Sequence, residues 1–136
     1  GWGSELTTEI TPMEAGLERF VDFSKCFLGR EATLSRKLLG VNTKLVYVSV
    51  ETVDSDCLGN EPVLNPKATS GENVIGVTTS GAYGHTVGKS LAFAYVQPKY
   101  AIPGTKFEIR VLGHNCSATV LKEAAYDPQN LRLRDV

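Results

Sequence analysis

Short stretches in which hydrophobic and polar residues alternate occupy most of the chain beyond residue 43. Residues 44–53 show the pattern most clearly, with a valine at every second position from Val46 to Val50. Successive side chains of a β-strand point to opposite faces, so this period of two predicts a strand. Similar stretches rich in β-branched or aromatic residues predict further strands. They lie at 63–64, 74–79, 90–96, 106–112 and 116–122.

One segment before the strands has the period of a helix. Residues 29–39 place alanine and leucine on one face and charged residues on the other, and Gly40 supplies a natural end. The apolar face consists of Ala32, Leu34, Leu38 and Leu39. Further upstream, residues 11–14 (TPME) have the order of an N-cap, a first-turn proline and an early carboxylate, which predicts a single helical turn. Residues 17–23 are expected to be extended.

Turn-forming residues separate the predicted strands. Glycine, proline, asparagine and aspartate gather at 54–56, 59–62, 65–72, 103–104 and 113–115. The small residues of 76–84 predict a strand that bends sharply, as closure of a small barrel requires. Short strands at even spacing are typical of such barrels, and closure removes exposed strand edges. We predict a mainly β fold: a small antiparallel, Greek-key-like β-barrel of about six strands with one helix at the N-terminal side.

Composition and charge argue against several classes of protein. A length of 136 residues leaves room for one core, and a net charge of -1 with a pI near 6.1 disfavours nucleic-acid and membrane-surface binding. The N-terminus has no signal-peptide pattern. Three widely spaced cysteines predict buried thiols in a reducing compartment. Because the chain begins with Gly1 and not with Met, we expect a processed, tagged or excised piece of a longer product.

Two motifs invite a chemical interpretation that the residues do not support. Residues 84–90 (GHTVGKS) are one residue short of the phosphate-binding pattern G-x-x-x-x-G-K-[ST], and a strand is predicted after them where that loop needs a helix. We therefore expect no nucleotide site. His85 and His114 have no cysteine or carboxylate at ligand spacing and are expected to be solvated. No catalytic residue and no metal ligand is assigned.

Several strings of residues resemble one known family, in the order in which they occur. The strings TPMEAGL at 11–17, FLGREA at 27–32, GVTTSGAY at 76–83 and KSLAFAYV at 89–96 resemble segments of glycine-cleavage T-proteins. The ending AYDPQNLRL at 125–133 resembles the T-protein-like C-terminal regions of FAD-dependent dimethylglycine and sarcosine dehydrogenases. The resemblance implies the C-terminal barrel domain of a tetrahydrofolate-dependent aminomethyltransferase-like module in one-carbon metabolism.

The resemblance also implies how the chain is organised. Residues 1–28 would be an irregular end of a missing folate-binding domain, residues 29–125 the helix and barrel, and residues 126–136 an extended tail. Tetrahydrofolate would bind in the parent protein and FAD in a missing upstream domain, with no cofactor bound to this chain alone. The family's catalytic Asp lies outside the chain, so the fragment is expected to be inactive. The bacterial cytoplasm or the mitochondrial matrix would be its location.

The resemblance carries over one site residue, Arg132. It lies six residues after the aromatic Tyr126, where an arginine of some T-proteins reaches tetrahydrofolate. A guanidinium suits a folate carbonyl or carboxylate. A solvated tail arginine remains the alternative for this residue, and Arg134 lies close enough in sequence to be confused with it.

A missing domain would leave apolar surface exposed, expected around Trp2, Leu6 and Met13, through which the fragment could self-associate. Its partners would then be the folate-binding and flavin domains of the same chain, with no nucleic acid and no membrane. The alternative function is a non-catalytic binding or regulatory module that reuses the barrel.

Overall fold

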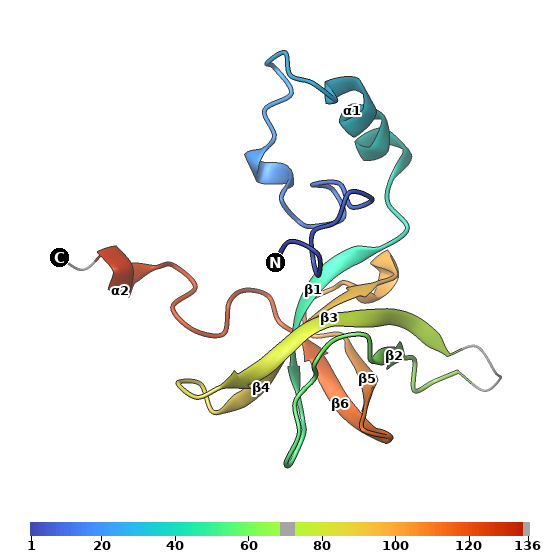
Figure 1. Ribbon diagram of the computed structural model, residues 1–136, viewed down its shortest axis with the longest axis vertical. Helices are drawn as coiled ribbons and strands as arrows, with labels where there is room; N and C mark the ends of the chain where they lie inside the picture. The colour runs from blue at the N-terminus through green and yellow to red at the C-terminus, as the bar shows by residue number, and fades with distance from the viewer. Residues whose placement is uncertain (69–72, 135–136) are drawn as a thin grey trace.

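The computed structural model describes residues 1–68 and 73–134 (Figure 1). Strands predominate, and each strand expected from the alternating pattern is present. The elements in chain order are η1 (Glu18–Phe20), α1 (Arg30–Leu39), β1 (Lys44–Val50), β2 (Pro62–Leu64), β3 (Val74–Gly84), β4 (Lys89–Val96), η2 (Pro98–Tyr100), β5 (Lys106–Val111), β6 (His114–Val120) and α2 (Leu131–Arg134). The turn expected at 65–72 lies partly outside the described residues. No helix in the described part of the chain has the length and apolarity needed to cross a bilayer.

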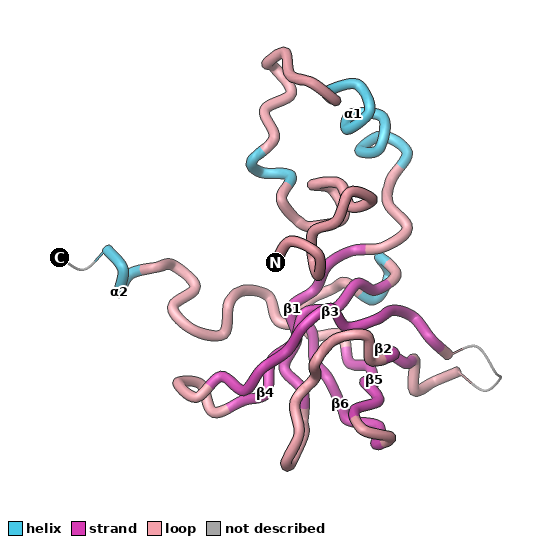
Figure 2. The backbone as a smooth tube through the Cα atoms, in the orientation of Figure 1, coloured by secondary structure: helices cyan, strands magenta, loops and turns pink. Residues whose placement is uncertain are grey.

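The strands close into an antiparallel barrel in the order β1-β4-β3-β2-β5-β6 (Figure 2). Closure comes from β1, which pairs with β4 along its whole length and with β6 near its end. β2, β3 and β4 are neighbours both in sequence and in space. β1, which precedes them in the chain, pairs with β4 and not with β2. This is the Greek-key arrangement, so the predicted fold is confirmed.

The barrel interior is filled by the inward half of each alternating strand. Val46, Val48 and Val50 of β1 are buried, as are Phe107 and Ile109 of β5. Full burial of one such side chain contributes about 1.5–3 kcal/mol relative to an exposed one. The hydrophobic period of two gives every strand one apolar face. Burial of these faces against one another favours the closed barrel.

β3 bends where the sequence predicted a bend. It continues past the expected end at Thr79, and its pairing with β4 shifts between Thr78 and Ser80, so a β-bulge lies in mid-strand. A Cβ atom at Gly76 would lie 2.1 Å from the Tyr95 carbonyl oxygen, and one at Gly81 would lie 2.6 Å from a backbone oxygen. Only glycine allows such close approach of two backbones.

The N-terminal segment contains the predicted capped turn at residues 11–14. The backbone N–H of Thr11 donates to the Glu14 carboxylate at 3.1 Å, and the N–H of Met13 donates to the Thr11 hydroxyl at 3.2 Å. The N–H of Ala15 closes the turn on the Thr11 carbonyl at 3.1 Å. The Thr11 hydroxyl thus caps the turn and the Glu14 carboxylate binds back to the N–H of Thr11, which confirms the predicted turn. The extended conformation expected for 17–23 is wrong, because η1 forms there through local hydrogen bonds.

Glu5 attaches the N-terminal segment to the barrel. Its carboxylate accepts hydrogen bonds from the hydroxyls of Thr79 and Ser80 at 2.6 Å each, and Tyr95 donates to its carbonyl oxygen at 2.7 Å. Burial acts to raise the pKa of the Glu5 carboxyl, but the hydrogen bonds from Gly1, Ser80 and Thr79 outweigh it and lower that pKa to about 2. Glu5 therefore remains charged at neutral pH and holds the two hydroxyls at the bulge.

The N-terminal segment and the C-terminal tail each differ from expectation, the first in the burial of its apolar residues and the second in its conformation. Met13 is buried, so its prediction as exposed apolar surface is wrong, while Trp2 is 78% exposed and Leu6 half-buried. The tail, expected to be extended, forms one helical turn, α2. The Asp127 carboxylate stabilises this turn, because it accepts hydrogen bonds from the N–H groups of Leu131 at 2.8 Å and Arg132 at 3.1 Å.

Candidate binding grooves

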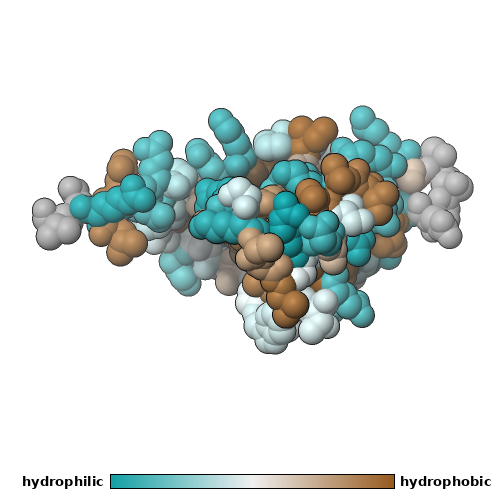
Figure 3. Space-filling view, turned by 90° about the horizontal axis from the view of Figure 1, so that it is seen from above, coloured by the Kyte–Doolittle hydropathy of each residue, from teal (hydrophilic) through white to brown (hydrophobic). Residues whose placement is uncertain are grey.

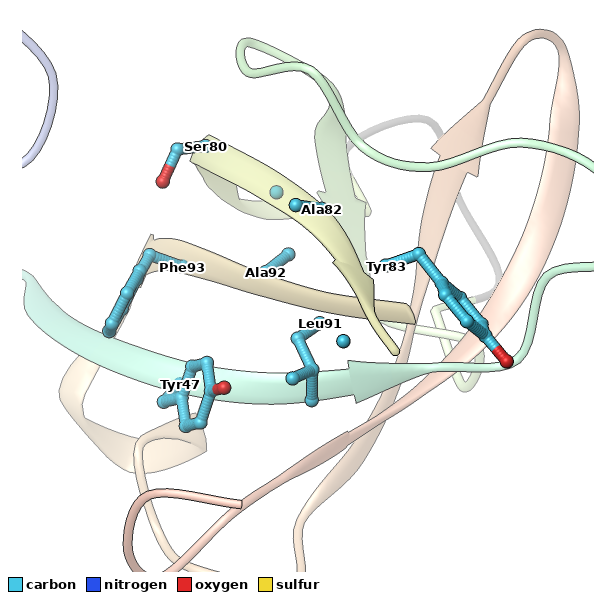
Figure 4. Close-up of a pocket in the computed structure, with 9 residues that line it drawn as sticks. Tyr47, Ser80, Ala82, Tyr83, Leu91, Ala92 and Phe93 are labelled. Carbon is cyan, nitrogen blue, oxygen red and sulfur yellow. The ribbon is translucent and has the colours of Figure 1, made fainter. Parts of the chain in front are cut away.

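An aromatic pair lies on the outer face of the barrel. Tyr47 of β1 and Phe93 of β4 are directly opposite in the strand register, and their ring centroids are 4.8 Å apart. Both point outward because the residues beside them in each strand face the core. Figure 4 shows Phe93, Tyr47 and Leu91 in a row along these strands. Cross-strand aromatic contacts of this kind keep both rings in place.

A first groove of about 280 Å³ lies on this face, between β1, β3 and β4. Its lining is mainly apolar and includes no charged side chain: Tyr47, Ser80, Gly81, Ala82, Tyr83, Gly84, Leu91, Ala92 and Phe93. Such a surface can pack against another apolar surface or a flat ring. Its polar side-chain groups are the hydroxyls of Tyr47, Ser80 and Tyr83.

A second groove, of about 690 Å³, shares Tyr47 and Phe93 with the first. One wall comes from the N-terminal segment and the other from the segment that follows β6. The lining residues are Ala15, Gly16, Arg19, Leu45, Val46, Tyr47, Phe93, Ala101, Pro103, Val120, Leu121, Lys122, Glu123, Ala124, Ala125 and Tyr126. Its volume lies within the range of roughly 300–1,000 Å³ that is usual for small-molecule sites.

Both walls of the second groove are hydrogen-bonded to β1. On one side, the N–H of Leu45 donates to the Glu14 carbonyl at 2.9 Å. On the other, the N–H of Leu121 donates to the Tyr47 carbonyl at 2.8 Å. In Figure 1 the N-terminal segment lies above the barrel, and the tail leaves the barrel to the left. The barrel thus supplies the floor, and segments outside it supply the walls.

The second groove contains positive charge next to aromatic rings. Arg19 lines one wall, with its guanidinium carbon 4.6 Å from the centroid of the Phe20 ring, and Lys122 lies on the other wall beside Glu123. Cations and aromatic faces in one groove suit a flat, anionic ligand. Within the described ranges, no group of three His, Cys, Asp or Glu side chains is placed to hold a metal ion.

Arg132, the predicted site residue, lies beside the second groove and does not line it. It belongs to α2 and is exposed, and its guanidinium carbon is 5.6 Å from the centroid of the Tyr126 ring, which does line the groove. Arg134 lies in the same helical turn and is also exposed. The tail therefore brings Arg132 close to the rim of the groove through its contact with Tyr126.

The remaining candidate residues from the sequence have no place in either groove. His85 is exposed and packs edge-on against Tyr83, with ring centroids 5.1 Å apart, and His114 is exposed at the start of β6. Residues 89–96 form a strand, as expected, so no helix follows the GKS sequence.

The cysteines agree only partly with the expectation that all three are buried. Cys57 is buried and Cys116 is half-buried, but Cys26 is exposed, so the prediction is wrong for Cys26. Burial, followed by the nearby charge of Glu61, raises the pKa of the Cys57 thiol to about 12. The Cys57 thiol is therefore unreactive at neutral pH.

Four residues of the grooves, Arg19, Tyr47, Phe93 and Tyr126, were not identified as site residues from the sequence. The alternation along 44–53 separates Tyr47 from Val46 and Val48, but it does not show which of the two faces points outward. The sequence pattern also does not give the strand register, which makes Tyr47 and Phe93 neighbours. Arg19 had no local signal, because its partner wall lies a hundred residues further along the chain.

The chain is similar to known proteins of one family. The family described as the glycine cleavage T-protein C-terminal barrel domain matches residues 44–127. The mitochondrial dimethylglycine dehydrogenase of Mus musculus is 39% identical over 137 residues, which cover 98% of this chain and 15% of that protein. The aminomethyltransferase of Aquifex aeolicus is 36% identical over 121 residues, covering 89% of this chain and 32% of that protein.

A solved structure supports the fold. The glycine cleavage system aminomethyltransferase T from Bartonella henselae superposes with a TM-score of 0.83 at 23% identity, covering 94% of this chain and 35% of that chain. At this identity the likeness shows the fold alone. The chain spans only a minor part of the length of each of these relatives.

Proposed function

We propose a function from the premise that the chain belongs to the glycine-cleavage T-protein family through its C-terminal barrel domain. In this proposal the chain forms one wall of a tetrahydrofolate pocket in a longer enzyme. That enzyme would be of the dimethylglycine or sarcosine dehydrogenase type. It would oxidatively demethylate an N-methylated glycine and pass the one-carbon unit to tetrahydrofolate. The 39% identity to a dimethylglycine dehydrogenase over nearly the whole chain supports this branch of the family.

The observation that supports the proposal is the contact of Arg132 with Tyr126, which lines the second groove. Tyr126 lines that groove and lies under the Arg132 guanidinium, so the tail presents an arginine and an aromatic ring together. A guanidinium can bind a carbonyl or a carboxylate through two parallel hydrogen bonds. Tetrahydrofolate has flat rings, a carbonyl and carboxylates, which matches this combination.

The chain's own part in the reaction would be to bind and orient, not to transfer protons or electrons. The grooves contain aromatic rings, arginine, lysine and a single carboxylate, Glu123, and no pair of carboxylates. Proton transfer and flavin chemistry would belong to the folate-binding and FAD domains upstream. The isolated chain would therefore be inactive. The protein would lie in the mitochondrial matrix in a eukaryote, as the names of the mammalian relatives suggest, or in the bacterial cytoplasm.

The upstream domain would dock on the N-terminal end of the molecule. Trp2, Leu28, Leu38 and Leu39 are all strongly exposed there. Figure 3, seen from above, shows apolar side chains among the polar ones on this end. We propose that residues 1–28 complete the folate-binding domain, that residues 29–125 form the barrel unit and that residues 126–136 are a tail. Without its partner, the apolar surface favours self-association.

The test replaces Arg132 in the full-length protein that contains this chain. Arg132→Ala should raise the apparent KM for tetrahydrofolate about ten- to a hundred-fold, because a charge-assisted contact contributes roughly 1.5–3 kcal/mol. Steady-state kinetics should show amine oxidation at the flavin nearly unchanged, since the two sites are separate. Arg132→Lys should recover only part of the affinity, because lysine cannot form two parallel hydrogen bonds.

Arg134→Ala is the matched control, because Arg134 lies in the same helical turn and lacks the contact with Tyr126. It should leave the KM for tetrahydrofolate nearly unchanged. Equal effects of the two alanine variants would refute the role of Arg132, as would unfolding of Arg132→Ala in a thermal melt.

A further inference from the structure

Arg19 differs from the other cations of the N-terminal segment in having no acidic partner among the described residues. Residues 1–43 contain five lysines and arginines. The other four each form an ion pair: Lys25 with Asp22, Arg30 with Glu31, Arg36 with Glu14 and Lys37 with Glu18. Arg19 is also the only one of the five that lines the second groove. Its charge is therefore available to a ligand in that groove.

The surroundings of Arg19 leave it exposed to a ligand. Its wall of the groove otherwise consists of Ala15 and Gly16, which have small side chains and no charge. The Phe20 ring supports the guanidinium at 4.6 Å. The opposite wall carries charges of both signs, because Lys122 and Glu123 both line it. Arg19 is thus the charged group that the N-terminal wall presents to an anionic ligand.

We propose that Arg19 binds a carboxylate of the glutamate tail of tetrahydrofolate, across the groove from the segment that carries Tyr126 and Arg132. This inference rests on the proposed function and assigns a second anion contact within the same pocket. The glutamate tail has two carboxylates, so two arginines on opposite sides can each bind one. The Tyr47–Phe93 pair on the groove floor remains free to pack against the flat rings.

The test compares two one-carbon acceptors on the full-length protein: tetrahydrofolate and tetrahydropteroate, which has the same rings but lacks the glutamate. Arg19→Ala should raise the apparent KM for tetrahydrofolate about ten-fold, the effect of losing one charge-assisted contact. It should leave the KM for tetrahydropteroate and the rate of amine oxidation unchanged. A residue that only maintains the shape of the groove would affect both acceptors alike.

Two further variants separate charge from structure. Arg19→Lys should recover part of the affinity for tetrahydrofolate, and Lys25→Ala, an exposed cation outside the groove, should change neither KM. The inference is overturned if Arg19→Ala affects both acceptors equally or affects neither.

The outcome for Arg19 can be told apart from the outcome for the pocket. If Arg132→Ala weakens tetrahydrofolate binding and Arg19→Ala does not, then only the role of Arg19 fails. If turnover of the unaltered protein does not respond to tetrahydrofolate, then the proposed function fails, and the inference about Arg19 fails with it.

Discussion

Gly76 and Gly84 lie in the same strand, but a methyl group added to each would meet different neighbours. At Gly76 it would lie 2.1 Å from the backbone oxygen of Tyr95, which the β3–β4 pairing holds in place. At Gly84 the nearest atoms, at 2.8 and 2.9 Å, are the ends of the Leu91 and Val87 side chains. Backbone cannot move aside without breaking the ladder, whereas side-chain ends can rotate.

We therefore expect Gly76→Ala to cost about 3 kcal/mol or more and Gly84→Ala about 1 kcal/mol, following the usual range for overpacking. Urea unfolding of the isolated chain, followed by circular dichroism, measures both. Equal destabilisation by the two substitutions would show that close backbone approach is not what requires glycine at position 76.

At the scale of single residues, the sequence indicated where the backbone bends, but it did not indicate which residues come into contact there. The run of small residues at 76–84 predicted a bend, and a bulge lies there. The pairing of β3 with β4 determines which backbone segment approaches Gly76. The residues around Gly76 do not predict that pairing. Arg132 was identified through a family resemblance alone, and its contact with Tyr126 became visible only in the folded tail.

At the scale of elements, the strands and α1 could be predicted because their hydrophobic period is local. The two short turns, η1 and α2, were missed because they depend on a few specific hydrogen bonds. For α2 a signal did exist, since Asp127 followed by Pro128 is a common start of a turn, and the Asp127 carboxylate binds the N–H groups of that turn.

The helix α1 has an apolar face that the barrel does not cover. Leu38 is 78% exposed and Leu39 85% exposed, and no residue of α1 is buried. In an ordinary globular domain the apolar stripe of a helix packs against the core. The stripe of α1 is thus free to pack against another part of the longer enzyme that we propose.

The predicted consequence is that these leucines contribute little to the stability of the isolated chain. Leu38→Ala and Leu39→Ala should each change the free energy of unfolding by less than about 0.5 kcal/mol, as exposed substitutions do. Ile109→Ala, in the barrel core, should cost about 2–5 kcal/mol. In the full-length protein the two leucine variants should become clearly destabilising. No difference between the two contexts would argue against docking through α1.

At the scale of the whole molecule, the second groove joins parts of the chain that are far apart in sequence. The wall around Arg19 and the wall around Tyr126 both lie outside the barrel strands, and each is hydrogen-bonded to β1. The closed barrel could be predicted because it follows from many local patterns that agree. The groove could not, because it depends on where two irregular segments leave the barrel.

The central claim is that this domain forms one wall of a tetrahydrofolate pocket. Hydrogen–deuterium exchange of the full-length protein, with and without saturating tetrahydrofolate, tests it directly. We predict slower amide exchange in the presence of tetrahydrofolate at residues 15–20 and 121–134, with β5 unchanged as an internal reference. Protection confined to residues outside this chain, or equal protection of β5, would contradict the claim.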